Sequence, residues 1–188
     1  MKIKIAIILL GIILTSCGGE PYYKKREKRL NLAKEEYSRL TSEQRQLAED
    51  IFNNDYNSDI QNVPRKNNIL VIHKRNGEVL PDIETNDDLK EGGYNVTYNP
   101  SELEYFIAIK TKGTESGKYT DGSAALDTET NIYVIDVKNG NKYKIYNEFL
   151  KAPEKIQKSR SDKETHRYGE RGIEGSSLVK LIIDKVIE

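Results

Sequence analysis

The sequence predicts an α+β protein in which a helical segment precedes a small β-sheet and a second helix follows it. Three observations predict this class. Apolar residues recur every three or four positions between residues 30 and 57, alternate with polar residues in the middle of the chain, and return to helical spacing near the C-terminus. Two Asn-Gly pairs, at 76–77 and 139–140, lie between apolar runs and indicate hairpins. Strands grouped between helices favour an antiparallel sheet.

The helical segment spans residues 30–57. Thr41 and Gln44 have the spacing of a capping box, which would begin a new helix at Ser42. The sequence therefore leaves open whether the segment is one long helix or two helices broken at Leu40. Packing of its apolar stripe against the domain is favoured over a coiled-coil stalk, because coiled coils sustain more heptads. The stripe consists of Leu30, Ala33, Tyr37, Leu40, Leu47 and Ile51, with Gln44 among them.

The sheet is expected to have four to six strands. The predicted strands are residues 69–73, 78–80, 103–112 and the two halves of 131–149. Residues 103–112 are apolar on both faces, which is typical of a central strand. Between the strands, residues 82–102 are acidic and rich in turn formers, and residues 113–130 form an excursion rich in Gly, Ser and Thr.

The C-terminal part begins with residues 151–175, which are expected to form a long loop because they hold few apolar side chains. Ser176 is expected to cap a helix whose apolar side should pack on the sheet. Leu178, Leu181, Ile182 and Val186 form that side.

The first residues have the pattern of a secretory leader. Lys2 and Lys4 precede about ten apolar residues, which matches a signal peptide and is short of the roughly 20 residues that a spanning helix needs. Cys17, the only cysteine, ends this run. It has no disulfide partner, and the apolar run offers neither a base nor the electropositive surroundings of a reactive thiol.

Leu14-Thr15-Ser16-Cys17 resembles the lipobox of bacterial lipoproteins in order and spacing. In that family the cysteine is lipidated and the preceding peptide is removed. The resemblance, which covers residues 1–17, implies that Cys17 begins the mature chain and anchors it outside the cytoplasm, on a periplasmic membrane face or the cell surface. Several acyl chains, at about 0.8 kcal/mol per buried CH₂, hold a protein stably on a bilayer. An ordinary cleaved leader or an uncleaved helix is the alternative.

On this interpretation the chain divides into a signal peptide (1–17), a tether with a basic juxtamembrane segment (18–29), the helical segment (30–57) and a small α+β domain (58–188). The basic segment could contact anionic lipid head groups, at up to about 1 kcal/mol for each cation. A solvated first helical turn is an equal alternative. The basic residues are Lys24, Lys25, Arg26, Lys28 and Arg29.

Charge and motifs exclude several classes of function. Loss of Lys2 and Lys4 with the leader leaves 28 basic and 30 acidic side chains, a net charge of −2, which disfavours nucleic-acid binding. With Cys17 lipidated, the two histidines cannot complete a Cys/His zinc site, and a metalloprotease motif is absent. The excursion matches neither a phosphate-binding loop nor a calcium-binding loop. We expect no metal and no cofactor, and expect His73 to be a satisfied edge residue.

The best candidate binding loop is His166, Arg167, Tyr168 and Arg171, because these residue types recur at interaction hot spots. A solvated loop is the alternative. The sequence favours a lipid-anchored, non-enzymatic binding module that contacts an unidentified protein partner through residues 113–130 and 151–175. The alternatives are a small envelope hydrolase with an irregular acidic site and a structural envelope component that oligomerises through residues 24–57.

Overall fold

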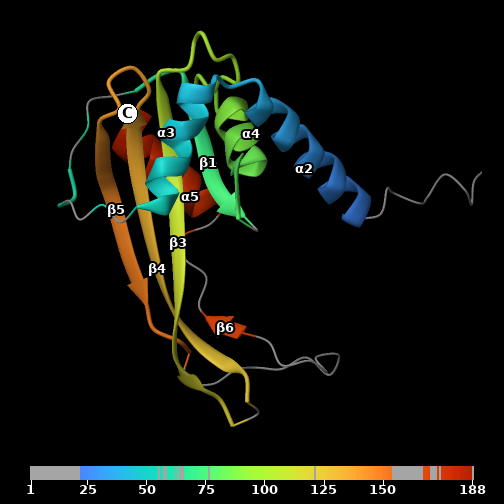
Figure 1. The fold of residues 1–188 in the computed structure, drawn as a ribbon, viewed down its shortest axis with the longest axis vertical. Helices are drawn as coiled ribbons and strands as arrows, with labels where there is room; N and C mark the ends of the chain where they lie inside the picture. The colour runs from blue at the N-terminus through green and yellow to red at the C-terminus, as the bar shows by residue number, and fades with distance from the viewer. Residues whose placement is uncertain are drawn as a thin grey trace, which may run out of the picture.

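The structure is a computed structural model that describes residues 22–54, 56, 59–61, 63, 66–75, 77–120, 122–153, 167–169, 173 and 175–187. Cys17 and the rest of the leader lie outside these residues. In Figure 1 a sheet occupies the centre, and helices cover one half of it on both faces. The predicted α+β class is confirmed. No helix in the described part of the chain is long and apolar enough to cross a bilayer.

The sheet has five strands in the order β2-β1-β3-β4-β5, and a sixth short strand, β6, pairs with β4. The strands are β1 (Ile69–Arg75), β2 (Glu78–Pro81), β3 (Tyr105–Lys118), β4 (Ala124–Asp136), β5 (Lys142–Leu150) and β6 (Arg167–Gly169). The expectation of an antiparallel sheet is wrong in two places, because β1 pairs with β3 and β4 pairs with β6 in parallel. After β2 the chain crosses over to the other side of β1. There β3 pairs with β1 and runs in the same direction.

Both predicted hairpins are confirmed. β1 and β2 pair antiparallel around Gly77, which has a φ of +84°, and β4 and β5 pair antiparallel around Gly140. Asn76 lies outside the described residues. In the second turn the Asp136 side chain accepts hydrogen bonds from the backbone N–H groups of Lys138 (2.9 Å) and Asn139 (3.0 Å). Gly140, at φ +70°, supplies the left-handed conformation that the turn requires.

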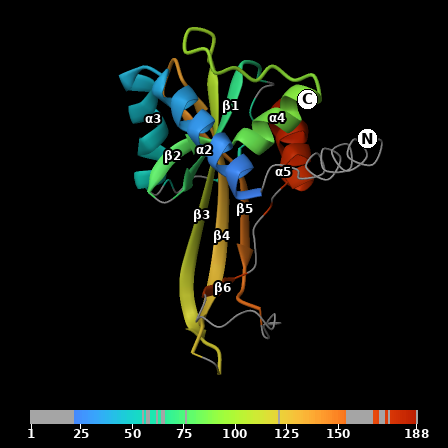
Figure 2. The same ribbon diagram turned by 90° about the vertical axis from the view of Figure 1, so that its right-hand side faces the viewer.

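Residues 113–130 do not form the expected excursion. β3 and β4 stay paired from Tyr105 opposite Asp136 to Lys118 opposite Ala124, with one irregularity between Glu115 and Gly117. Threonine favours the extended conformation, and each strand supplies the pairing partner of the other, so the glycines do not end the strands. We call residues 111–118 and 124–130 the β-arm. Figures 1 and 2 show it extending beyond the helix-covered half of the sheet.

The helical segment is two helices, α2 (Tyr22–Ser38) and α3 (Ser42–Asn53). The capping box separates them: Gln44 N–H donates to Thr41 Oγ1 (3.2 Å), and Thr41 N–H donates to Gln44 Oε1 (3.0 Å). α2 contacts β2, and α3 packs on one face of the sheet. The basic residues 24–29 belong to α2.

A further helix, α4 (Ile83–Glu91), lies within the acidic, turn-rich residues 82–102, where no helix was predicted. Its N-cap is Asp82, whose side chain accepts a hydrogen bond from Thr85 N–H (3.2 Å). Ile83 and Leu89 are the only buried apolar residues of α4, so its sequence shows no apolar stripe at helical spacing.

The C-terminal helix α5 (Gly175–Ile182) continues into a π-helical turn, η1 (Ile183–Ile187). Because α5 begins at Gly175, Ser176 lies inside its first turn and is not the expected N-cap. Leu178, Ile182 and Val186 pack on the sheet, which confirms the predicted contact.

The two sheet faces carry separate parts of the core. The face under α3 contains Leu70, Ile72, Phe106, Ala108, Tyr133 and Ile135. The face under α5 contains Ile69, Val71, Ile107, Ile132, Val134 and Ile145. β3 contributes buried side chains to both faces and lies between β1 and β4, as expected of a central strand.

Candidate functional site

At the β-arm, described parts of the two segments that were expected to form the contact surface lie together. All side chains of residues 111–118 are exposed. β6 pairs with β4 at the arm, with Arg167 opposite Ala124 and Gly169 opposite Leu126. The first residues after β5 also join the arm, because Ala152 N–H donates to Asp127 Oδ1 (2.8 Å) and Tyr119 Oη donates to the Pro153 carbonyl (2.6 Å).

The predicted binding loop is only partly described. The backbones of Arg167 and Tyr168 belong to β6 and therefore lie along the β-arm. His166 and Arg171 lie outside the described residues, as does the predicted lipidation site, Cys17. The structure thus places two of the four candidate loop residues beside the arm.

The basic segment lies on the first turns of α2. Lys24, Lys25 and Lys28 are exposed, and the backbone of Arg26 belongs to the same helix. Arg29 forms an ion pair with Glu84 of α4, with 2.7 Å between Nη1 and Oε1. Arg29 therefore contributes to the contact between α2 and α4. Lys24, Lys25 and Lys28 are exposed on the same helix.

A hollow of about 510 Å³ lies at the root of the β-arm. It forms because β1 pairs with β3 only as far as His73 opposite Ile109, whereas β3 continues to Lys118. We call it the root hollow. Its lining is made of Phe52, Asn53, His73, Lys74, Asp82, Ile109, Lys110, Thr111, Lys112, Ile173 and Leu178.

The lining of the root hollow is rich in cations. Lys74 Nζ donates to Asn53 Oδ1 (2.8 Å), and Lys110 Nζ donates to the Asn54 carbonyl (2.6 Å). Both lysines thus lie at the C-terminal end of α3, where helix carbonyls favour positive charge. Lys112 follows on the exposed part of β3. Among the described residues that line the hollow, the one carboxylate is that of Asp82, which is engaged with His73 and the start of α4.

His73 and Asp82 form a half-buried pair in this lining, with 3.3 Å between Nδ1 and Oδ2. The expectation that His73 lies at an edge is wrong, because β1 has β2 on one side and β3 on the other. Burial raises the pKa of the Asp82 carboxyl, but the hydrogen bond and charge of His73, with the hydrogen bonds from Thr85, outweigh it and lower that pKa below its ordinary value.

The lowered pKa predicts how Asp82 affects stability against pH. Its contribution to the free energy of unfolding is present above the ordinary carboxyl pKa of about 3.9 and is lost as the pH falls through the lower folded value. Asp82→Asn keeps an N-cap acceptor but removes the charge. Urea unfolding at a series of pH values should therefore show a flatter acid limb for Asp82→Asn than for the original protein.

Asp82→Ala, which also removes the cap, should cost about 1 kcal/mol at pH 7. Identical acid limbs for the original protein and Asp82→Asn would show that the carboxylate contributes nothing specific to the folded state.

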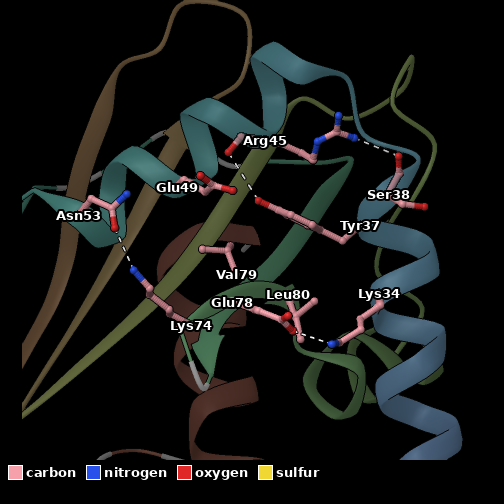
Figure 3. Close-up of a pocket in the computed structure, with 11 residues that line it drawn as sticks. Lys34, Tyr37, Ser38, Arg45, Glu49, Asn53, Lys74, Glu78, Val79 and Leu80 are labelled. Atoms are coloured by element: carbon pink, nitrogen blue, oxygen red, sulfur yellow. Dashed lines mark hydrogen bonds and ion pairs between the residues drawn. The ribbon is translucent and has the colours of Figure 1, made fainter.

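A second, larger hollow of about 730 Å³ lies between α2, α3 and the β1–β2 hairpin. Figure 3 shows two side-chain pairs in its lining, Lys34 with Glu78 and Lys74 with Asn53; the second pair also lines the root hollow. Lys34 Nζ pairs with Glu78 Oε2 (2.7 Å), and Arg45 Nη1 donates to the carbonyls of Ser38 (3.0 Å) and Leu40 (2.6 Å). These contacts join α2 to α3 and β2.

Tyr37 crosses this second hollow, and its hydroxyl donates to the Arg45 carbonyl (3.5 Å). Burial and the nearby charge of Glu49 raise the pKa of Tyr37 to about 12, against the opposing effect of Arg45. The phenol therefore stays protonated at neutral pH. The contacts of Lys34, Tyr37 and Arg45 hold α2 against α3 and β2, so the root hollow and the β-arm are the better candidate site.

Comparison of the chain with protein-family models, curated proteins and solved structures found no match. Among the described residues, no group of three or more His, Cys, Asp or Glu side chains is arranged to hold a metal ion.

Sequence reasoning missed the root hollow, because its residues come from five segments that are far apart in the chain. One local signal was present. Asp82 directly precedes α4 at the distance from Thr85 that an N-cap requires, which could have indicated a helix start. Nothing local indicates that His73 approaches Asp82, since that contact depends on the β1–β2 hairpin.

Proposed function

We propose that this chain is a lipid-anchored protein of the bacterial cell envelope that binds a partner through its β-arm. The anchor would be lipid on Cys17, and it is supported by the resemblance of residues 14–17 to a lipobox. The protein would then lie outside the cytoplasm, on a membrane face or the cell surface.

The observation that carries the binding role is the β-arm itself. Its β3 side chains are exposed, and it extends beyond the helices that cover the rest of the sheet. Ordering a strand costs about 1–2 kcal/mol of backbone entropy per residue, and exposed strands recover little of this through burial. Long exposed strands also invite unwanted pairing, so proteins normally shorten or cover them. An arm of this length is therefore best explained by a contact that it makes.

The exposed lysines of α2 support a second contact, with anionic lipid. Lys24, Lys25 and Lys28 lie within eleven residues of Cys17 in the chain. Lipid on Cys17 would hold these cations close to the head groups, where each contributes up to about 1 kcal/mol. This contact would orient the protein on the membrane and leave the arm to the partner.

Site-specific photocrosslinking in the native envelope tests the binding role. A photoreactive residue at Thr114 or Ser116, both exposed on the arm, should yield a discrete adduct with another protein. The matched control is the same residue at Lys138, which is exposed in the β4–β5 turn at the opposite end of β4. Adducts should appear on gels from the arm positions and not from 138. Absence of arm adducts, or equal adducts from all three positions, would contradict the binding role.

A further inference from the structure

The β3 side of the β-arm has an unpaired edge. The β1–β3 ladder ends at His73 opposite Ile109, and within the described part of the chain no strand pairs with residues 111–118 on that side. The side chains of these residues are all exposed. β3 pairs with β4 on its other edge along this whole length, so the strand is held extended.

The backbone of Thr111 and Gly113 faces this edge. Alternate residues of a strand direct their N–H and C=O groups to opposite edges. Both Glu104 N–H (3.0 Å) and Tyr105 N–H (3.4 Å) donate to the Asn68 carbonyl, so these bonds alone do not set the alternation. The Glu104 carbonyl accepts from Val137 N–H, just after β4 (2.9 Å), so even-numbered residues of β3 face β4 and odd-numbered residues face β1. Beyond the end of the β1–β3 ladder, the same alternation directs the backbone N–H and C=O groups of Thr111 and Gly113 to the edge where β1 no longer pairs. The irregularity in the β3–β4 pairing comes later, between Glu115 and Gly117.

The root hollow offers different chemistry on the two faces of this position. Lys74 and Lys110 contact Asn53 and Asn54 of the α3 end, so they lie on the α3 face, and Lys112 shares that face by alternation. On the opposite face three apolar side chains line the hollow, with Thr111 and the His73–Asp82 pair beside them. The apolar residues are Ile109, Ile173 and Leu178, which belong to the core under α5.

We infer that the β-arm binds an extended acidic peptide segment, which adds to the sheet as a strand beside β3 and begins in the root hollow. Its backbone pairs with Thr111 and Gly113, its acidic side chains meet the lysines, and the apolar side chains between them enter the α5 face. This inference rests on the proposed function, since it names the partner of the same arm.

Charge favours an acidic peptide over a second copy of this chain. Two copies paired through β3 would bring the lysines of both edges together, and like charges on neighbouring strands are destabilising. Glu129, which lies opposite Lys112 on β4, keeps its charge but directs its side chain toward β5 and away from the free edge of β3. Its Oε1 accepts hydrogen bonds from the amides of Asn131 and Asn147, both at 3.0 Å.

The test uses the full chain purified in detergent and a fluorescent eight-residue peptide in which glutamate and valine alternate. Fluorescence anisotropy measures its affinity, and the control peptide has lysine in place of glutamate. The acidic peptide should bind and the basic one should not. Absence of binding by the acidic peptide, or equal binding of the two, would overturn the inference.

Gly113 allows a matched test of backbone pairing. Gly113→Pro removes the N–H that faces the added strand and leaves the β4 side of the ladder intact, as edge positions tolerate. Gly113→Ala keeps the N–H, and its added Cβ would lie 3.6 Å from Leu126 Cδ1, an ordinary contact. The proline variant should bind the acidic peptide about tenfold more weakly, and the alanine variant nearly as well as the original. Equal affinities of the two variants would rule out strand addition.

A second pair of variants tests the charges and remains informative if the proline variant does not fold. Lys74→Gln combined with Lys112→Gln should weaken peptide binding about fivefold and reduce its dependence on salt. Lys138→Gln, in the β4–β5 turn, should change neither. If the double variant and Lys138→Gln bind the peptide with equal affinity, Lys74 and Lys112 do not form the binding surface.

Failure here is distinguishable from failure of the proposed function. Arm adducts in the envelope without peptide binding would leave a partner of another chemistry, and would overturn only the acidic strand. Absence of arm adducts would contradict the binding role itself.

Discussion

Replacement of Cys17 by alanine should move the protein from the membrane fraction to the soluble fraction, or leave its leader uncleaved. The thiol is the proposed attachment point of the lipid, and without it the remaining attraction is that of exposed lysines, about 1 kcal/mol each, which salt screens. Lipid chains contribute about 0.8 kcal/mol per buried CH₂, so the expected change is close to complete.

Fractionation of cells in high salt, followed by detection of the protein and its size, measures the outcome. Ser16→Ala is the control, because it changes the neighbouring residue and keeps the thiol. Metabolic labelling with a fatty acid should label the original protein and Ser16→Ala, and not Cys17→Ala. A Cys17→Ala protein that stays on the membrane and is processed to the normal size would contradict the anchor.

Replacement of Asn86 by alanine should lower the free energy of unfolding by about 2–3 kcal/mol. Asn86 is fully buried in α4, and its amide pairs with the edge of β1 where β2 has ended. Val71 N–H donates to Asn86 Oδ1 (2.9 Å), and Asn86 Nδ2 donates to the Val71 carbonyl (2.9 Å). In the alanine variant the Val71 carbonyl would keep one hydrogen bond, because it also accepts from Asp82 N–H (2.9 Å). The Val71 N–H would be buried without an acceptor.

Urea unfolding followed by circular dichroism measures this loss. Asn86→Asp tests the two hydrogen bonds separately. A carboxylate can still accept from Val71 N–H, but it cannot donate to the Val71 carbonyl and puts a negative charge beside that oxygen. We expect it to be at least as destabilising as alanine. Asp87→Ala, at the neighbouring exposed position, should change stability by less than about 0.5 kcal/mol. If Asn86→Ala and Asp87→Ala unfold at the same urea concentration, the amide does not support β1.

The helix α4 shows why a local pattern can fail. Its buried positions include Thr85 and Asn86, which are polar, so an apolar stripe is not visible in the sequence. Asn86 is buried because it bonds to the backbone of β1, a partner fifteen residues away. By contrast, the break between α2 and α3 could be predicted, because the capping box joins Thr41 to a residue only three positions on.

The β-arm shows the same limit for strands. Residues 113–130 contain glycine, serine and threonine in proportions that usually indicate a loop. They form strands because the β3–β4 ladder begins in the core and continues into them. Each further pair of residues is added next to a pair that is already hydrogen-bonded. The parallel pairing of β1 with β3 likewise depends on where α4 returns the chain.

The sequence by itself determined the α+β class, both Asn-Gly hairpins, the two-faced strand β3 and the C-terminal helix on the sheet, and it predicts an anchor at Cys17. Each of these follows from residues within one turn, one strand or one helix. Only the tertiary structure decided the mixed sheet, the β-arm and the meeting of His73 with Asp82 in the root hollow. The physical reason is range. Caps, turns and periodicity act over a few residues, whereas strand pairing and the hollow it leaves depend on segments that meet only when the chain is folded.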